Sequence, residues 1–434
     1  MEKKELKRIL GFWDSVAINI GIVIGVGIFR VPAEVAKFLD SAPWILFAWF
    51  AGGLISLFGV ICYAELSSRF PHTGGTYVYL REAYGRLAGF LYGWIEFLIL
   101  RAGSLAGVAY IFSDYLRHFI PFGAAGEKTV PITAIAFFTA VNIAGLRLGA
   151  GVQNFLSVLK AAAILLISGT IFGMGSGGIF KEAALTAAAK TAPLAGLAPA
   201  LIPILWSYGG WHESTFMSGE FKDTRRALPR SLVAGIFFIA ALYITINAAY
   251  LKMMRPEEMI RSPAIAADIF QALFGPAGKT VITCVVLISA CGALNSTILT
   301  GGRIPFAVGR DFPRFGWLSQ VHARTETPLA SYAANAIWAS VLVIWGNFEQ
   351  LLFFCGFAKW LEFTLVGLSI FFIRKKHTGE GAIPLRGMEA VAPIIFTLTS
   401  AWLCGTTIAY APREALVGAF LILAGIPVYR CLNR

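Results

Sequence analysis

The sequence predicts an all-α integral membrane protein with twelve transmembrane helices. Hydrophobic residues make up 57% of the chain and charged residues only 14%, and the mean hydropathy is +0.71, which lies outside the composition of soluble globular domains. The apolar residues fall in runs of about 20, the length at which a helix crosses a bilayer. Two of these runs are interrupted by glycine, at GIVIGVGIF (residues 21–29) and at WSYGGW (residues 206–211).

The apolar runs place the helices in order along one transmembrane domain that spans residues 1–434. No soluble domain interrupts the chain. The first run is too long and too rich in glycine for a cleavable signal peptide, so we expect it to remain in the mature protein. The predicted helices lie at roughly 12–38, 43–67, 87–119, 130–146, 152–175, 197–218, 230–252, 277–308, 329–346, 350–374, 388–408 and 413–430.

The two glycine-broken runs occupy matching places in two blocks of five helices. The blocks cover residues 12–175 and 197–374, and two further helices follow at 388–430. Helix 1 enters from the cytoplasm and helix 6 from outside, so we expect the blocks to form an inverted repeat. Unwound backbone is tolerated at membrane depth only where it lines a cavity or a site. We therefore expect both breaks to form one substrate site.

The two breaks have complementary chemistry. Around Gly25, Val26 and Gly27 the second half-helix presents free N–H groups and a positive dipole end, which suit a carboxylate. Near Trp206 and Ser207 the first half of helix 6 presents unpaired carbonyls and a negative dipole end, which suit an ammonium group. Together they would recognise a zwitterion. The alternative is that the glycines only allow close helix packing, and the matched positions favour the site.

Several charged side chains fall inside or beside the predicted helices. Lys160 lies deep in helix 5, where an ammonium group is costly unless it finds partners. Lys359 and Glu362 share one face of helix 10. They form either a neutralising ion pair, which we slightly favour, or a site in which Lys359 selects an acidic substrate. His212 and Glu213 follow the second break, and they are either hydrogen-bonded in place or relay protons.

Positive charge sets the expected orientation. With the N-terminus in the cytoplasm, cytoplasmic segments carry about twice as many Lys and Arg residues as external ones, as the positive-inside rule requires. We expect a multi-pass protein of the plasma (inner) membrane with both termini in the cytoplasm. The net charge of +12 is explained by anionic lipid at the inner leaflet, so no nucleic-acid partner is expected.

Ordered motifs along the chain carry a family resemblance. Besides the two breaks these are CYAELSSRFPHTGGTYVYLREAYG at 62–85, GWIEFLILR at 93–101, VQNFLSVLKA at 152–161, GEFKDTRRALPRS at 219–231 and ISACGALNSTIL at 288–299. Over about residues 10–430 the chain resembles the L-type amino-acid transporters of the amino acid, polyamine and organocation (APC) superfamily. The resemblance implies a LeuT-type fold and amino-acid transport by alternating access.

The resemblance also implies roles for single residues. Trp206 stands where relatives usually carry a phenylalanine gate over the substrate, although a packing role is the ordinary alternative for a tryptophan. Ser207 and Gly209 belong to the same substrate-binding stretch. Lys160 stands where sodium sits in sodium-coupled relatives and would hold helix 1 against helix 8. It would either be a permanent structural charge, which suits an exchanger, or shed its proton during the cycle, which suits proton symport. Arg101 with Glu96 matches a structural feature of the family.

The chain departs from the family pattern at three positions. Ile22, Val26 and Ala293 stand where relatives commonly carry hydroxyl groups, so Ile22 and Val26 would line the site without donating a side-chain hydrogen bond. The external loop RHFIPFGAAGEKTVP lacks the cysteine that links some relatives to a glycoprotein subunit. We therefore expect no disulfide-linked heavy subunit, and a monomer or a homodimer.

The sequence thus predicts a sodium-independent secondary transporter of amino acids, with neutral substrates favoured, that works by antiport or proton symport. The alternatives are a carrier of acidic or cationic amino acids or polyamines and, from another class, an ion channel. No catalytic motif is present, because GPAGKT at 275–280 has Leu273 where a P-loop needs its first glycine. We expect no enzyme activity, no cofactor and no metal site.

Overall fold

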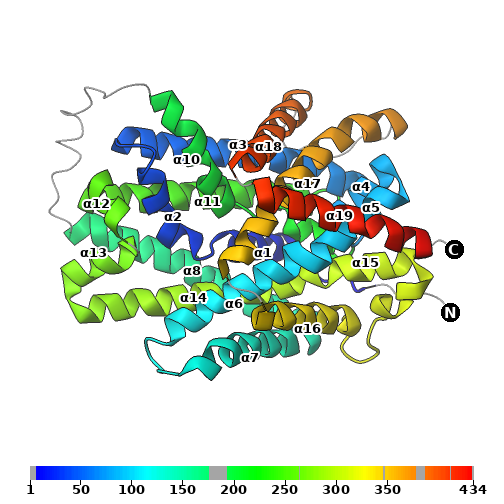
Figure 1. The fold of residues 1–434 in the computed structure, drawn as a ribbon, viewed down its shortest axis with the longest axis horizontal. Coiled ribbons are helices and arrows are strands. Elements are labelled where there is room, and N and C mark those ends of the chain that lie inside the picture. Colours follow the sequence, from blue (N-terminus) through cyan, green and yellow to red (C-terminus); the bar gives the residue numbers. More distant parts are fainter. Residues whose placement is uncertain are drawn as a thin grey trace.

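The helices begin and end where glycine, proline or charged residues interrupt the apolar runs. A computed structural model describes residues 6–174, 193–262, 264–345, 348–377, 387–410 and 412–432. Secondary structure in these ranges is helical (Figure 1), and their only β-type pairing is an isolated bridge between Leu10 and Phe221. The predicted all-α class is confirmed for the described part of the chain.

The described residues in the first half of the chain form eight α-helices. They are α1 (Phe12–Val23), α2 (Gly27–Ala36), α3 (Ala42–Arg69), α4 (Thr76–Tyr84), α5 (Arg86–Ile95), α6 (Ala102–Leu116), α7 (Ala124–Ile143) and α8 (Leu146–Met174). A π-helical turn, η1 (Glu96–Arg101), joins α5 and α6 into one span. The polar helix α4 was not predicted, because its sequence TYVYLREAY is too short and too polar to read as a span.

The second half begins with α10 (Pro193–Ser207), which is followed by the 3-10 helix η2 (Glu213–Glu220). The remaining elements are α11 (Ala227–Met253), α12 (Pro256–Arg261), α13 (Ile265–Phe274), α14 (Pro276–Gly301), α15 (Arg303–Asp311), η3 (Pro313–Ser319), α16 (Leu329–Trp345), α17 (Phe348–Lys376), α18 (Val391–Tyr410) and α19 (Pro412–Leu432). Each predicted helix coincides with a helix in the structure, and the short α12 and α13 are additional.

Eight helices in the described ranges are long and apolar enough to cross a membrane, or nine if α1 and α2 count as one bent span. The predicted helices at 130–146, 197–218 and 329–346 correspond to α7, to α10 with η2, and to α16, which lie outside this set. The prediction of a multi-pass membrane protein is confirmed, and the count of twelve spans stays a prediction.

Large apolar side chains cover the outer surface of several helices. Phe155 and Leu166 on α8 are 68% and 70% exposed, and Leu416 and Phe420 on α19 are 70% and 69% exposed. A water-soluble protein rarely exposes apolar surface on this scale. These faces therefore suit contact with lipid tails.

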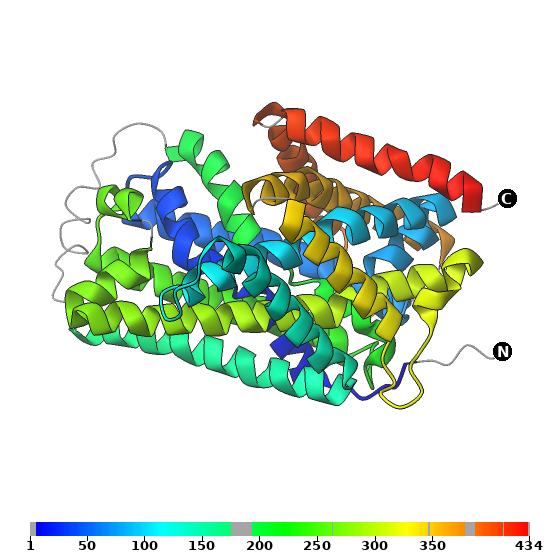
Figure 2. The same ribbon diagram turned by 60° about the horizontal axis from the view of Figure 1, so that its bottom comes forward.

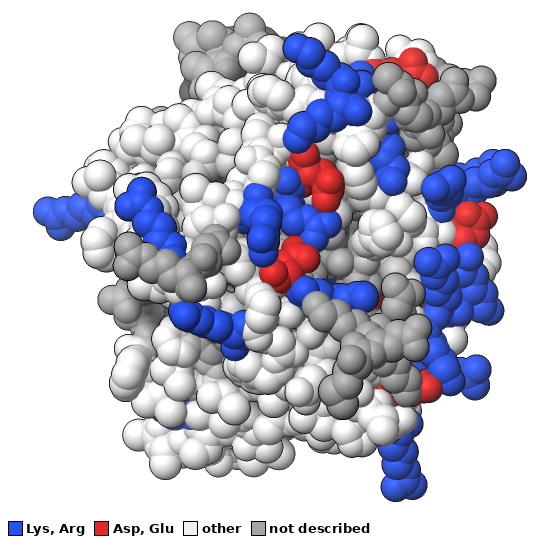
Figure 3. All heavy atoms as spheres, turned by 90° about the vertical axis from the view of Figure 1, so that its right-hand side faces the viewer, with Lys and Arg blue, Asp and Glu red and all other residues white. Residues whose placement is uncertain are grey.

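The broken segments lie in the interior of the helix bundle. Helix α1 packs against α8, α11 and α14, and α10 packs against α2 and α3 (Figures 1 and 2). The two termini lie toward the same end of the molecule (Figure 1). Figure 3 looks onto that end and shows many Lys and Arg side chains around a hollow.

Candidate functional site

The first break falls where the sequence places its glycines. Helix α1 ends at Val23 and α2 begins at Gly27, and the two axes meet at an angle of 50°. In the described ranges the Val26 and Gly27 N–H groups donate no backbone hydrogen bond outside α2. The first N–H groups of a helix have no partner within it. The start of α2 therefore offers donors to an anionic group.

The second break lies directly against the first. A Cβ atom on Gly27 would come to 3.0 Å from the Ser207 Oγ and 3.1 Å from the Trp206 ring. Gly210 has φ of +100°, and a Cβ atom there would lie 2.2 Å from Cγ2 of Ile22. Gly210 requires glycine, because its left-handed φ and the overlap with Ile22 both disfavour a side chain, and Gly27 leaves little room for one. The structure thus brings Ile22 and Gly27 together with Trp206, Ser207 and Gly210.

The carbonyls at the end of α10 are not unpaired, which corrects the expectation from the sequence. The Gly209 N–H donates to the Trp206 carbonyl at 3.0 Å, and the Tyr243 hydroxyl donates to the Ser207 carbonyl at 3.1 Å. The chain turns back at Gly209 and Gly210, which supplies the first of these donors. Each carbonyl oxygen keeps a second lone pair for a ligand.

Tyr243 is a member of the site that the sequence did not reveal. Its hydroxyl lies 2.6 Å from the Val23 carbonyl at the end of α1 and 3.1 Å from the Ser207 carbonyl at the end of α10. The side chain is fully buried on α11. One hydroxyl thus ties both breaks together. The only signal in the sequence was a tyrosine within an otherwise apolar run.

Trp206 differs in its surroundings from the packed tryptophans. Its side chain is 46% exposed, whereas Trp49 and Trp211 are 0% and 3% exposed. The Trp206 ring lies over the start of α2, next to Gly27. A large ring at a helix break is free to change position only if its neighbours do not enclose it, and Trp206 meets that condition.

Lys160 is buried on α8 and binds the end of α1. Its ammonium group donates to the Gly21 carbonyl at 2.7 Å and to the Ile24 carbonyl at 3.0 Å. Ser289 on α14 donates to the same Ile24 carbonyl at 3.1 Å. No carboxylate in the described ranges lies within ion-pair distance of Lys160. The positive charge is therefore met by carbonyl oxygens at the negative end of the α1 dipole.

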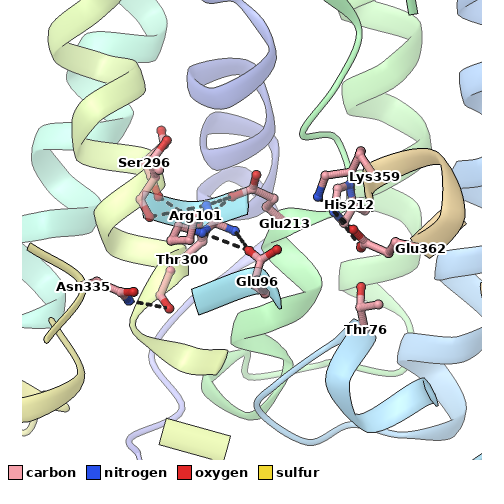
Figure 4. A network of polar contacts seen from close by, with 12 residues as sticks. Thr76, Glu96, Arg101, His212, Glu213, Ser296, Thr300, Asn335, Lys359 and Glu362 are labelled. Carbon is pink, nitrogen blue, oxygen red and sulfur yellow. Dashed lines mark hydrogen bonds and ion pairs between the residues drawn. The ribbon is translucent and has the colours of Figure 1, made fainter. Parts of the chain in front are cut away.

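The side chains of His212 and Glu213 join different clusters, so they do not form the pair that the sequence suggested (Figure 4). The Glu213 carboxylate binds Arg101 at 2.5 Å and accepts a hydrogen bond from Thr300 at 2.8 Å. Arg101 also binds Glu96 at 2.7 Å, which is the structural pair that the resemblance implied. Adjacent residues on this tight 3-10 turn diverge, because their side chains leave its axis in different directions.

Lys359 and Glu362 form an ion pair. The Lys359 Nζ lies 2.9 Å from the Glu362 Oε2, and the His212 Nε2 lies 3.7 Å from the Glu362 Oε1 (Figure 4). The Glu362 side chain is 2% exposed and that of Lys359 is 28% exposed. The carboxylate is thus the buried member, and the ammonium group reaches the edge of the packed region.

The sequence matches the family model for amino acid permeases over residues 10–429. The chain belongs to the amino acid permease family. It is 28% identical to the serine/threonine exchanger SteT of Bacillus subtilis, over 100% of this chain and 98% of that protein. It is 30% identical to the b(0,+)-type amino acid transporter 1 of Mus musculus (99% and 88%) and 28% identical to the cystine/glutamate transporter of Pongo abelii (99% and 86%). The predicted membership of the APC superfamily is confirmed, and the protein is a membrane transporter rather than an enzyme.

Two of the cavities among the described residues lie away from the helix breaks. One, of about 320 Å³, is lined by Arg8, His72, Arg81, Arg310 and Asp311 among others. The other, of about 370 Å³, is lined by residues that include Asp14, Arg147, Asn154 and Lys222. Both linings combine basic side chains with an aspartate and with apolar residues.

A fully buried ion pair holds the end of η2 in the permease. Arg303, at the start of α15, binds both carboxylate oxygens of Glu220, at 2.7 and 2.6 Å. The Glu220 carbonyl accepts hydrogen bonds from the Ile9 and Leu10 N–H groups at 2.9 and 3.0 Å. The chain before α1, the end of η2 and α15 are thus joined through one residue. In the described part of the permease no group of His, Cys, Asp and Glu side chains could hold a metal ion.

Proposed function

We propose that the permease is a sodium-independent secondary transporter of neutral amino acids that works by alternating access. The observation that carries this proposal is the contact between the two helix breaks, with N–H donors of α2 on one side and the carbonyl end of α10 on the other. A carboxylate suits the first and an ammonium group the second. This arrangement matches the carboxylate and ammonium groups of a zwitterionic amino acid. These groups are common to all amino acids, so their recognition does not depend on the substrate's side chain.

Lys160 supports the absence of sodium coupling. Its ammonium group already binds the Gly21 and Ile24 carbonyls, and Ser289 binds Ile24 from α14. A sodium ion would need the same oxygen atoms. A cation built into the chain thus replaces a transported one at this place.

The ion pair of Lys359 and Glu362 supports neutral substrates. With the ammonium group 2.9 Å from a carboxylate of its own chain, binding an acidic side chain would require breaking that pair. The relatives differ in substrate by name, since one is a serine/threonine exchanger and another a cystine/glutamate transporter. A carrier of acidic amino acids is therefore the second candidate.

The architecture proposed for this function is a LeuT-type fold with twelve spans, in which residues 12–175 and 197–374 are inverted repeats. The basic end of the molecule in Figure 3 would face the cytoplasm of a cell whose inner membrane holds the protein. No cysteine lies in the loop after α6, at 117–123. We propose that the permease acts without a disulfide-linked subunit, as a monomer or a homodimer.

Reconstitution into liposomes tests the proposal. A panel of labelled amino acids is offered with and without unlabelled amino acid inside, and with and without a pH gradient. We expect saturable uptake that internal substrate or the gradient accelerates. Conductance without saturation or counterflow would instead indicate a channel, and uptake of glutamate far above alanine and leucine would favour the acidic carrier.

A further inference from the structure

A buried network around the second break carries one more negative charge than positive charge. The carboxylates are those of Glu96, Glu213 and Glu362, and the cations are Arg101 and Lys359 (Figure 4). The Arg101 cluster holds two carboxylates for one cation, and the Lys359–Glu362 pair beside it is balanced. An unbalanced charge is unfavourable inside a membrane protein. One additional positive charge would bring the net charge of this network to zero.

His212 lies beside this network without a hydrogen-bond partner. Its side chain is 1% exposed, and neither ring nitrogen has a hydrogen-bond partner in the described part of the chain. The rings of Tyr63, Trp211, Phe216 and Phe363 lie around it with centroids at 5.1 to 5.5 Å. An imidazole always has a donor or an acceptor at each nitrogen. Buried polar groups are usually paired, so His212 has unused hydrogen-bonding capacity at both nitrogens.

We propose that His212 and Glu362 together bind one proton, which the permease takes up with its substrate. The inference rests on the function proposed above and adds the coupling ion and its site. The His212 Nε2 and the Glu362 Oε1 are 3.7 Å apart, which is longer than a hydrogen bond. A proton added from water to either atom creates a donor facing an acceptor. The two atoms then approach, and the net charge of the network falls to zero.

The neighbours of Glu362 favour a proton that can leave again. Lys359 on α17 lies 2.9 Å from the Glu362 carboxylate and competes with a proton for it, while Glu96 on η1 is held by Arg101. The polar groups that face the pair from other elements are the hydroxyls of Tyr63 on α3, Thr76 on α4 and Tyr92 on α5. In the described ranges α6, α18 and α19 place no acidic or basic side chain within ion-pair distance. A proton on this pair thus competes with the Lys359 ammonium group for the Glu362 carboxylate.

The proposed proton site is mechanically connected to the substrate site. His212 belongs to the connection between α10 and η2, in which Gly210 touches Ile22 of the first break. The Trp211 ring stacks on Phe363 at 5.5 Å, next to Glu362. Attraction between His212 and Glu362 would therefore tighten this connection against α17. Lys160 is a separate base, since its partners are carbonyls of α1.

The experiment compares the wild type with Glu362→Gln, His212→Asn and the control Glu127→Gln in proteoliposomes. Glu127 is an exposed carboxylate that pairs with Arg117. We expect wild-type uptake to rise as the external pH falls, by at most about tenfold per pH unit, the limit for one proton. Both site variants should lose this dependence and retain exchange of labelled for unlabelled substrate, while the control behaves as wild type.

The results separate this inference from the proposed function. Persistence of the wild-type pH dependence in either site variant, or its absence from the wild type, overturns the proton site while leaving carrier-type exchange intact. Absence of saturable exchange in the wild type refutes the proposed function itself. If a variant does not transport, proton uptake on substrate binding is measured in weakly buffered detergent. Uptake by the wild type alone supports the site, and equal uptake by the variants contradicts it.

Discussion

Two residue pairs show how the same side-chain type acquires different roles from its surroundings. Trp49 and Trp206 are 0% and 46% exposed, although each lies in an apolar stretch of sequence. Lys160 is met by carbonyls, whereas Lys359 is met by a carboxylate. At this scale the partner within reach, rather than the residue type, decides what a side chain can do.

Trp206→Ala should leave the permease folded and inserted but strongly reduce uptake, while Trp206→Phe should retain much of it. The ring covers the start of α2, and an aromatic ring of smaller area would still cover part of it. Initial uptake rates in proteoliposomes measure the effect. Trp345→Ala is the matched control, because Trp345 is 82% exposed. Equal rates for Trp206→Ala and the wild type would return Trp206 to a packing role.

Lys359→Asn should destabilise the permease more than Glu362→Gln does. The first change leaves a carboxylate that is 2% exposed without its partner, and loss of one partner of a buried pair costs about 3–5 kcal/mol. The second leaves the charge of a Lys359 side chain that is 28% exposed and therefore less enclosed than the carboxylate. The double variant should be close to the wild type. Thermal unfolding in detergent measures these differences.

The reading of Lys359 as a substrate-selecting residue makes the opposite forecast. In that case Lys359→Asn would leave stability little changed and would move preference from acidic toward neutral amino acids. A wild type that prefers glutamate and loses this preference in Lys359→Asn would contradict the structural pair.

At the scale of elements, the packing of the two breaks depends on glycine at their contact. Gly210 needs glycine for two reasons, its φ of +100° and its contact with Ile22. Gly85, before α5, has φ of +94° but no atom within 4 Å of a Cβ position. A side chain at Gly85 would thus meet backbone strain alone, whereas a side chain at Gly210 would meet both backbone strain and steric overlap.

Gly210→Ala should lower stability more than Gly85→Ala. Left-handed backbone costs an alanine about 1–2 kcal/mol, and overpacking adds about 1–3 kcal/mol at Gly210 only. The double variant Ile22→Ala/Gly210→Ala removes the overlapping Cγ2 atom and should recover part of the loss, as thermal unfolding would show. No recovery would mean that the two breaks are not in contact at this point.

At the scale of the whole molecule, one face of α1 is held by three other helices. Lys160 on α8, Ser289 on α14 and Tyr243 on α11 all donate to carbonyls at the end of α1. Movement of α1 relative to these helices must break several of these hydrogen bonds together. Such an arrangement favours two discrete states over a gradual change.

Replacement of external sodium by choline should leave uptake unchanged. The reason is that the Lys160 ammonium group binds the Gly21 and Ile24 carbonyls, which we propose are the oxygen atoms that a sodium ion would need. Uptake assays at constant ionic strength test this. Loss of uptake in choline would show that Lys160 does not replace a transported cation. Its hydrogen bonds to the end of α1 would then have a structural role only.

The sequence by itself determined the helical class, the position of each long helix and the location of both breaks. These features depend on the local apolar run and on glycine, so they are readable from neighbouring residues alone. Predicted and observed helix boundaries differ where the prediction missed a local signal. One example is Gly145, which has φ of +149° and lies between α7 and α8. The polar α4 escaped prediction because it has no long apolar run.

Only the tertiary structure decided which polar groups meet. Glu213 binds Arg101, 112 positions away in the sequence, instead of pairing with its neighbour His212. Tyr243 joins two breaks that are each far from it along the chain. Side-chain partners across a helix bundle depend on the rotation and crossing of whole helices, which no local pattern records. The sequence therefore located the two breaks along the chain, and the packing of helices chose their contacts.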